Sequence, residues 1–323
     1  MNAPLFRALI LVTLAVAAAC APRVRVSNVA PPSADKFAEL WQAPQDLATR
    51  DLFHGPGGAD GKPAADAPFT WISTDTTGYS PGYDVRGADG RSWSVKLGSE
   101  AQSEIVASRI LWAIGYHQPA TYYVSNWQLA GGPGGQQQPG RFRLESEDAE
   151  VIGDWSWAEN EFLGTQQYQG LIVANVLLSN WDWKTSNNKI YRYKSKTSPP
   201  QRYVVRDLGA SLGKTTPSRL FWILPIQVRG FGQGSRNNID DFEAQGFIER
   251  VDENQVEFDF DSIYGSVVDL VHPSSVRWVS EWLNRVSDAQ WDDAFRAAEY
   301  SPEVRARFIR KIKSKIAEGL AVS

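Results

Sequence analysis

A short polar run beside two tryptophans in the middle of the chain carries the residue types that phosphate chemistry requires. Asp182, Lys184 and Asn187 stand at a D-x-K-x-x-N spacing, and Asp207 follows later, in a D-x-G that ends an apolar stretch. A carboxylate can accept or orient the proton of an attacking hydroxyl, and a nearby lysine can face a transferred phosphoryl group. An amide oxygen and a second carboxylate are hard ligands of the kind that Mg²⁺ prefers. The set therefore predicts phosphoryl transfer, with Asp182 and Lys184 as catalytic residues and Asn187 and Asp207 as metal ligands.

Two residues further upstream could complete such a site. Lys96 lies near the end of a stretch of alternating apolar residues, and Glu104 falls in the helix that is predicted to follow it. The lysine could pair with nucleotide phosphates, and the glutamate could hold the lysine in place through an ion pair. Each residue alone is more simply a solvated surface group, and the D-x-K-x-x-N run alone is more simply a polar turn. The order of all four along the chain (Lys96, Glu104, the D-x-K-x-x-N run and the D-x-G) favours a functional site.

The sequence around these residues predicts the strands and helices that would position them. Asp89-Gly90 is a turn signal between two alternating stretches, which should form a hairpin that ends near Lys96. A long helix should lead directly into the Asp182 loop, and a second hairpin should separate that loop from Asp207. The expected strands cover residues 69–74, 83–85, 91–97, 121–129, 189–193 and 202–206. The expected helices cover residues 33–41, 99–115, 159–178, 273–284, 288–298 and 301–320.

The order of these elements indicates an α+β fold with two lobes. Strands dominate the first part of the chain and helices the second, and a Gly- and Gln-rich run at 131–140 separates the two parts. A small antiparallel-sheet lobe, with the segment that precedes it, is therefore expected at 34–140. A larger, mainly helical lobe is expected at 141–323.

The N-terminal residues predict export from the cytoplasm. Arg7 precedes an apolar run that is too short to span a bilayer and ends at Cys20, the only cysteine of the chain. This pattern resembles a bacterial lipoprotein signal, with a signal peptide at 1–19, a lipid on Cys20 and a tether at 20–33. A plain secretory signal cut at Ala-x-Ala is the alternative. By resemblance to sorted lipoproteins, Ala21 implies the outer membrane, facing the periplasm.

Composition and charge exclude several classes of function. The chain has 323 residues, of which 42% are hydrophobic, so it can bury a large core. A formal net charge of −4 leaves no basic footprint for nucleic acid. A single cysteine and three scattered histidines exclude a disulfide framework and do not resemble a zinc motif. From the phosphate-type residues and the N-terminal pattern, the expected partners are a nucleotide, a hydroxyl acceptor and, through the lipid, a membrane, with no nucleic acid.

The D-x-K-x-x-N loop after a long helix, followed by a hairpin and an apolar D-x-G, resembles divergent members of the kinase-like superfamily. The similar families are HipA-type bacterial kinases, CotH-type spore-coat kinases, secreted protein kinases and type II phosphatidylinositol 4-kinases. The resemblance covers about residues 69–320 and implies a two-lobed kinase-like fold that binds ATP and Mg²⁺ in its cleft. It also implies phosphorylation of a hydroxyl on a protein, lipid or small molecule in the cell envelope.

The chain departs from ordinary protein kinases in three places. No G-x-G-x-x-G precedes Lys96, and Gly78 and Gly82 are the nearest candidates for a loop that cradles phosphates. Asn180-Trp181 replaces the His-Arg of ordinary protein kinases, and no A-P-E follows the D-x-G. A lipoprotein outside the cytoplasm also meets little ATP. An inactive, pseudokinase-type binding lipoprotein with a Trp-rich surface is therefore an open alternative.

A serine hydrolase is the rival interpretation. Ser211 stands in a G-x-S-x-G at 209–213 after a predicted strand, with His54 upstream and His272 downstream. A nucleophile elbow needs a helix right after its serine, whereas Lys-Thr-Thr-Pro at 214–217 is a poor helix opening. The chain also lacks the alternating strand–helix series of a doubly wound sheet. This context favours the kinase-like interpretation.

The last predicted helix is amphipathic and basic. Six Lys and Arg residues lie between 305 and 315, among apolar residues from Val304 to Ile316. The simplest interpretation is a helix that docks on the core with its charged face in solvent. Contact with an anionic membrane is the alternative.

Overall fold

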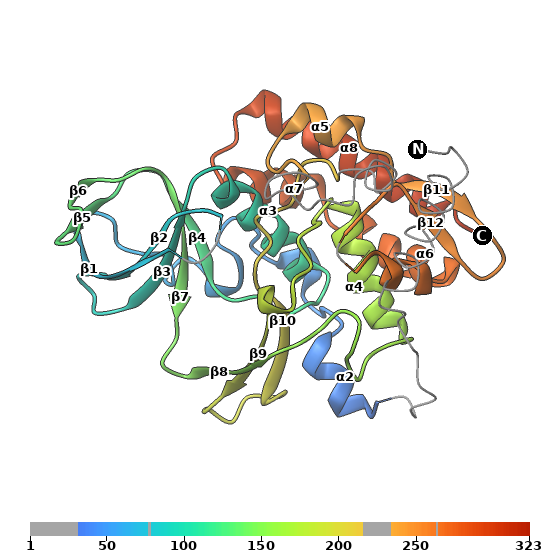
Figure 1. Cartoon of the computed structure of the whole chain (residues 1–323), viewed down its shortest axis with the longest axis horizontal. Helices are drawn as coiled ribbons and strands as arrows, with labels where there is room; N and C mark the ends of the chain where they lie inside the picture. Colours follow the sequence, from blue (N-terminus) through green and yellow to red (C-terminus); the bar gives the residue numbers. More distant parts are fainter. Residues whose placement is uncertain (1–31, 77–78, 216–233, 263) are drawn as a thin grey trace, which may run out of the picture.

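Two lobes of different composition lie side by side in the computed structural model, which describes residues 32–76, 79–215, 234–262 and 264–323. Figure 1 shows a curved sheet at one end of the molecule and a group of helices at the other. The two-lobed α+β arrangement that the sequence predicts is therefore confirmed. The predicted signal peptide, Cys20 and most of the tether lie outside the described residues.

The sheet of the smaller lobe consists of β1 (Phe69–Asp75), β2 (Gly82–Arg86), β3 (Ser92–Leu97), β4 (Thr121–Val124), β5 (Gln128–Ala130), β6 (Gly135–Gln136) and β7 (Gly140–Glu145). Its order is β4-β7-β3-β2-β1-β5-β6. The pairs are antiparallel apart from β1 with β5, which is parallel. The predicted first hairpin is present as β2 and β3, and Gly90 has the left-handed conformation (φ 80°) that its tight turn needs.

The boundary between the lobes lies further along the chain than the sequence indicates. β7 pairs with β3 over its whole length, from Glu145 opposite Ser92 to Gly140 opposite Leu97. The smaller lobe therefore extends to residue 145, and the predicted boundary at 140 is wrong. The Gly-rich run at 131–140 instead makes the tight turns around β6, where several of its glycines have positive φ. Glycine marks a turn equally well between two strands and between two lobes.

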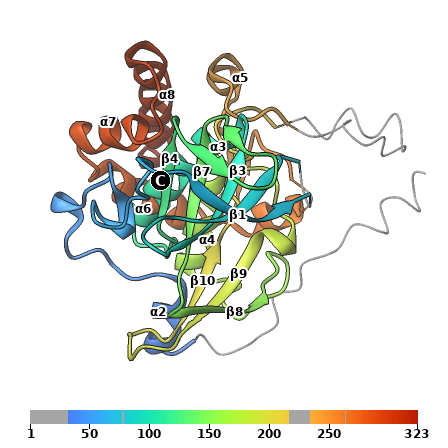
Figure 2. The ribbon, with the colours of Figure 1, turned by 90° about the vertical axis from the view of Figure 1, so that its left-hand side faces the viewer.

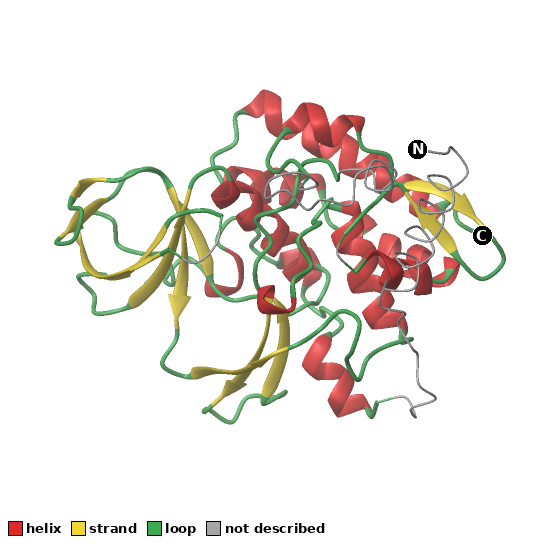
Figure 3. Ribbon diagram, viewed as in Figure 1, coloured by secondary structure: helices red, strands yellow, loops and turns green. Residues whose placement is uncertain are grey.

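Helices and two small sheets make up the rest of the described chain (Figure 3). The helices are α2 (Ala34–Leu40), α3 (Glu100–Ala113), α4 (Gln166–Leu177), α5 (Ile239–Ala244), α6 (Pro273–Asn284), α7 (Asp288–Arg296) and α8 (Pro302–Leu320). The strands β8 (Ala149–Asp154), β9 (Asn188–Tyr193) and β10 (Gln201–Val205) form an antiparallel sheet, and β11 (Ile248–Val251) pairs with β12 (Val256–Phe258). None of the described helices is long and apolar enough to cross a membrane.

Helix α4 is shorter than its apolar pattern predicts, and local chemistry sets its start. The pattern begins at residue 159, whereas the helix begins at Gln166. Gly164 has a φ of 80°, which interrupts any continuous helix, and the Thr165 hydroxyl then accepts the Tyr168 N–H as an N-cap. Apolar residues before the cap, such as Phe162, lie in a turn and are buried there. Their spacing in the sequence therefore resembles the apolar face of a helix.

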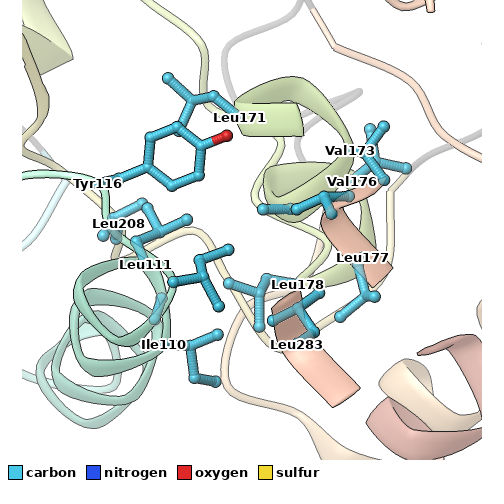
Figure 4. Close-up of a cluster of buried hydrophobic side chains, with 14 of the residues drawn as sticks. Ile110, Leu111, Tyr116, Leu171, Val173, Val176, Leu177, Leu178, Leu208 and Leu283 are labelled. Carbon is cyan, nitrogen blue, oxygen red and sulfur yellow. The ribbon is translucent and has the colours of Figure 1, made fainter. Parts of the chain in front are cut away.

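The main core lies where α3, α4 and α6 meet. Figure 4 shows Leu111 of α3 and Leu283 of α6 close to Leu178, the residue that ends α4. All three belong to one continuous cluster of buried apolar side chains. Leu208 of the D-x-G segment belongs to the same cluster. The core therefore anchors the D-x-G segment and the chain that leads into the Asp182 loop.

Helix α3 joins the two lobes. It lies against β3, β4 and β7 of the sheet, while Ile105, Ile110 and neighbouring residues belong to the main core. Figure 2, in which the sheet faces the viewer, shows α3 behind the strands. Because both sides of the helix are covered, polar residues such as Glu104 and Arg109 are also buried on it. They need polar or charged partners inside the protein.

Acidic residues on neighbouring helices neutralise much of the basic face of α8. Arg305 lies 2.6 Å from Asp292 of α7. Arg307 pairs with Glu243 of α5 through its guanidinium group. These contacts within the fold fit the interpretation in which this helix docks on the core.

The close contact of α4 with α6 generates a stability prediction. A Cβ added at Gly170 would lie 2.4 Å from a ring carbon of Trp278 and 2.8 Å from the Tyr116 hydroxyl. Gly170→Ala should therefore lower the free energy of unfolding by about 1–3 kcal/mol, although alanine is the better helix former. No atom lies within 4 Å of a Cβ added at Gly153, so Gly153→Ala should change the free energy of unfolding by less than about 0.5 kcal/mol. Urea denaturation measures the free energy of unfolding of both variants. Equal effects would contradict the close packing of α4 against α6 at Gly170.

Candidate functional site

Side chains alternate between buried and exposed along the D-x-K-x-x-N segment. Trp181 and Trp183 are 7% and 0% exposed, and Trp183 stacks on Trp157 with ring centroids 4.5 Å apart. Asp182 and Lys184, at the positions between and after them, face outward, with Lys184 Nζ 2.9 Å from Asp182 Oδ2. The two tryptophans therefore anchor the segment in the larger lobe and present the two predicted catalytic residues to solvent.

The start of this loop is held to the end of α4. The Asn180 backbone N–H bonds to the Asn175 carbonyl, and its amide nitrogen donates to Asn175 Oδ1 at 2.8 Å. Lys315 of α8 donates to the Leu177 carbonyl at 3.1 Å and lies 3.4 Å from Ser179 Oγ. Ser179 is in the left-handed region (φ 54°), where the chain turns sharply away from the helix. A buried lysine Nζ thus donates to a carbonyl oxygen at the C-terminal end of α4.

Backbone hydrogen bonds bring Asn187 and Asp207 together. The Asn187 carbonyl accepts the N–H groups of Arg206 and Asp207, at 2.9 and 3.1 Å. Asn187 Nδ2 donates to the Asp182 carbonyl at 2.8 Å, which leaves the amide oxygen for another partner. Asp207 Oδ1 accepts the Gly209 N–H at 3.1 Å. The two motifs that the sequence singles out are therefore adjacent in space.

Lys96 reaches from β3 of the smaller lobe to Asp207 of the larger one. Its Nζ lies 2.7 Å from Asp207 Oδ2 and 3.4 Å from Glu104 Oε2. Burial disfavours the charge on Lys96, but the carboxylates of Glu104 and Asp207 outweigh burial and raise the lysine pKa. Burial also disfavours the charge on Asp207, yet Lys96 holds the pKa of this carboxyl well below its usual value. Both groups are therefore charged at neutral pH.

Glu104 is shared by three cations. Besides Lys96, its Oε1 lies 2.9 Å from Arg141 Nε and 4.0 Å from Arg143 Nη1. These groups attract as charges, but they are not aligned for hydrogen bonding, and neither Glu104 oxygen has a hydrogen-bond partner among the described residues. Arg141 is the β7 residue directly opposite Lys96 on β3, and Arg143 follows two positions later on the same side of the strand. One buried carboxylate therefore serves three cations.

These groups line one cleft, with a volume of about 480 Å³, between the lobes. Among the predicted site residues, those that line it are Lys96, Gly82, Asp182, Lys184, Asn187 and Asp207. Glu104 contacts Lys96 from behind, with only 1% of its surface exposed, and Gly78 lies outside the described residues. The structure thus brings the described part of the predicted set together.

Glu100, in the first turn of α3, connects several segments at this cleft. Its Oε2 accepts the Ser80 hydroxyl at 2.7 Å and lies 3.6 Å from Lys96 Nζ. Its Oε1 pairs with the Arg236 guanidinium, which also lies 3.9 Å from the centre of the Tyr79 ring. Glu100 therefore links the loop before β2 to α3 and to a segment of the larger lobe.

Sequence reasoning missed Glu100, Arg141, Arg143 and Arg206, all of which line the cleft. A signal existed for the two β7 residues, because Arg-Phe-Arg-Leu at 141–144 alternates charged and apolar side chains as a strand does. The glycine-rich run before it suggested a lobe boundary instead. Glu100 has no distinctive signal, since acidic residues are common in the first turn of any helix.

Asp207 and Asn187 form a donor set that suits a hard divalent cation. The Asp207 carboxylate keeps 35% of its surface exposed, and Asn187 offers an amide oxygen beside it. Mg²⁺ is usually held by one or two carboxylates and completes its shell with substrate phosphates and water. Within the described ranges no group of three or more His, Cys, Asp or Glu could bind a metal alone. The residues present therefore fit Mg²⁺ that arrives with a phosphate ligand.

The structure does not assemble the triad of a serine hydrolase. Ser211 is fully buried, and its Oγ has no hydrogen-bond partner in the described part of the chain. His54 pairs with Asp51 at 2.6 Å, and His272 is the N-cap of α6, with its backbone N–H bonded to Gln169. A buried hydroxyl without a neighbouring base is not an activated nucleophile.

No protein-family model matches this chain, and no curated protein matches it either. Among solved structures, the chain is similar to the Helicobacter pylori proinflammatory kinase CtkA, with a TM-score of 0.42 and 12% sequence identity. The similarity covers 79% of this chain and 94% of the kinase. At this TM-score the similarity adds nothing to the assignment of the site, which depends on the contacts described above.

Removing the shared carboxylate should destabilise the protein. Glu104→Gln leaves Lys96, Arg141 and Arg143 around a neutral amide in a buried place, so the free energy of unfolding should fall by about 3 kcal/mol or more. Glu147→Gln makes the same change at an exposed position and should alter the free energy of unfolding by less than about 0.5 kcal/mol. Chemical denaturation compares them, and a loss below about 1 kcal/mol at Glu104 would contradict the shared-carboxylate description.

The buried Lys315 should make stability depend on pH. Burial lowers its pKa to about 7, so the unfolded chain, with a lysine pKa of 10.5, binds more protons than the folded chain between these values. The free energy of unfolding should therefore rise with pH in this window, by at most about 1.4 kcal/mol per pH unit. Lys315→Met should remove this rise, which amounts to about 2 kcal/mol from pH 7.5 to 9.5.

Denaturation at several pH values gives the difference between wild type and Lys315→Met. Lys62→Met, at an exposed position, is the matched control and should keep the wild-type slope. Parallel pH profiles for wild type and Lys315→Met would show that Lys315 is charged in the folded protein throughout this range.

Proposed function

We propose that this protein is a kinase-like phosphotransferase that uses ATP and Mg²⁺ to phosphorylate a hydroxyl acceptor in the cell envelope. The observation that supports the proposal is the convergence of charged groups from distant parts of the chain on one cleft. Lys96 and Asp207 are 111 residues apart in sequence and 2.7 Å apart in space. Asp182, Lys184 and Asn187 line the same cleft.

The residues of this cleft have separate roles in the proposal. Asp182 accepts or orients the proton of the acceptor hydroxyl, and Lys184 beside it faces the transferred phosphoryl group. Lys96 pairs with phosphate oxygens of the nucleotide, and Glu104 positions Lys96 through their ion pair. Such chemistry depends mainly on position and charge, which the buried ion pairs and the anchored loop supply.

Asn187 and Asp207 would hold Mg²⁺. When bound, the ion would neutralise charge on the phosphates. The low pKa of Asp207 supports this role, because the carboxylate is ionised without any competing proton at neutral pH. Gly82 lies in the same cleft, on β2 opposite Lys96, and the proposed phosphate-cradling loop includes Gly82 and Gly78.

The cellular setting is part of the proposal. A lipid on Cys20 would anchor the protein at the outer membrane, facing the periplasm, with the tether at 20–33 between the lipid and the fold. The acceptor could be a protein, a lipid or a small molecule that carries a hydroxyl. A protein that binds nucleotide without turning it over is the alternative, and the presence of both Asp182 and Lys184 in the cleft favours catalysis.

Nucleotide binding is the first test. The free energy of unfolding of the soluble domain, from about residue 30, should rise by about 2.7 kcal/mol when ATP with Mg²⁺ is present at a hundred times its dissociation constant. Asp207→Ala should lose this stabilisation. Asp66→Ala, an exposed aspartate outside the cleft, is the matched control and should keep it. No stabilisation of wild type would rule the proposal out.

Turnover separates a kinase from a binding-only protein. Asp182→Ala should keep the stabilisation by ATP but reduce ADP production about a hundredfold or more, because proton transfer typically contributes 10²–10⁴-fold to a rate. ADP release by wild type, Asp182→Ala and Asp66→Ala measures this, with water or a hydroxyl of the protein itself as the phosphoryl acceptor. Binding in wild type without any ADP production above that of Asp182→Ala would favour the inactive alternative.

A further inference from the structure

The walls of the cleft are charged to an unusual degree. Seventeen described residues line it, and ten of them carry a charge. The six basic ones are Lys96, Arg141, Arg143, Lys184, Lys189 and Arg206. Four acidic residues face them, so the cleft lining has a formal excess of positive charge. A ligand that fits these walls is anionic and polar.

Few of the described residues in the same lining are apolar. Val95 is the aliphatic residue and Tyr79 the aromatic one among the lining residues that the structure describes. Tyr79 is 71% exposed, and the Arg236 guanidinium lies over its ring. Sites that enclose an aromatic base typically surround it with apolar and aromatic side chains. The described part of these walls therefore offers a nucleobase few apolar side chains to pack against.

Two buried arginines at the base of the cleft have unused donors. The side chains of Arg141 and Arg143 are 2% and 5% exposed. Arg141 donates one N–H to the Ser94 carbonyl at 2.9 Å, and Arg143 donates one to Ser94 Oγ at 3.0 Å. The Nε groups of both are fully buried and face carboxylates, with Arg141 Nε 2.9 Å from Glu104 Oε1 and Arg143 Nε 3.5 Å from Glu145 Oε1. Since a guanidinium has five N–H donors in a fork that matches phosphate, terminal N–H groups of both arginines remain for an anion in the cleft.

The charge balance supports the same conclusion. Lys96 is also paired with Asp207 and Glu100. Glu104 is therefore the buried carboxylate that Arg141 and Arg143 share. The carboxylate of Glu145, near Arg143, is 48% exposed, so water screens it. Buried charges that lack a full counter-charge are unfavourable, and a phosphate bound beside them would relieve this cost.

We infer that the cleft selects its nucleotide by the phosphates and is indifferent to the base. ATP, GTP, UTP and inorganic tripolyphosphate then bind alike, with Arg143 and Arg141 as phosphate-binding residues beside Lys96. The inference rests on the proposed function, because it specifies the class of phosphoryl donor that the same cleft accepts.

Calorimetric titration of the soluble domain tests the inference. The ligands are ATP, GTP, UTP, tripolyphosphate and adenosine, each with Mg²⁺ at one fixed ionic strength. The three nucleotides and tripolyphosphate should have dissociation constants within about tenfold of one another, and adenosine should not bind measurably. Affinity for all four anions should fall in parallel as salt is raised, because the shared interaction is electrostatic.

Variants of Arg143 connect the selectivity to the arginine pair. Arg143→Leu should weaken ATP, GTP, UTP and tripolyphosphate by a similar factor of about 10–100, the range expected for a charge-assisted hydrogen bond. Arg143→Lys keeps the charge and should recover part of this loss. Arg86→Leu makes the same change at an exposed position of the same sheet, outside the cleft, and should leave all affinities unchanged. Circular dichroism confirms that each variant is folded.

The outcomes separate this inference from the proposed function. Binding of ATP more than about tenfold tighter than GTP, UTP or tripolyphosphate would show that the base is read. The inference would then be wrong, while the proposed function would stand. Unequal losses among the four anions in folded Arg143→Leu would also overturn the inference. If no nucleotide binds to wild type with Mg²⁺, the proposed function itself fails.

Discussion

The ion pair between Lys96 Nζ and Asp207 Oδ2, 2.7 Å apart, connects the sheet of the smaller lobe to the end of β10 in the larger one. Each charge lies in a partly buried place, so each depends on the other, and the pair sets the spacing of the lobes. Helix α3 supports this arrangement from behind, because Ser103 Oγ donates to the Gly209 carbonyl at 2.8 Å. A Cβ at Gly209 would lie 2.8 Å from Glu100 Cβ, so the D-x-G needs glycine for this close approach.

Beside this ion pair, the buried Glu104 carboxylate is shared by Lys96, Arg141 and Arg143. Both Glu104 oxygens and the Nε groups of the two arginines lack a hydrogen-bond partner within the described chain. A protein whose stability alone mattered would gain by replacing such a cluster with apolar residues. The anionic ligand that we propose would complete this cluster.

Rigid packing around the polar loop would support the proposed chemistry. Trp181 and Trp183 bury the faces of the segment on both sides of Asp182, and Lys315 holds the turn that precedes it. A carboxylate that receives a proton must keep its distance from the acceptor within fractions of an ångström. The large aromatic anchors supply this rigidity, which explains why tryptophans stand directly beside the partly exposed Asp182 and the exposed Lys184.

The sequence by itself determined the local structure and the chemical groups of the site. Hairpin turns, helix caps and apolar periods act over a few residues, so the β2–β3 and β9–β10 hairpins and helices α6 to α8 lie close to their predicted positions. The spacing of polar residues also identified the two motifs. Backbone hydrogen bonds from Arg206 and Asp207 to the Asn187 carbonyl bring these motifs together in space. Only the tertiary structure decided that β7 pairs beside β3, that the smaller lobe extends to residue 145, and that Arg141 and Arg143 meet Glu104. These features depend on strand neighbours and buried charges far apart in the chain, which no local pattern encodes.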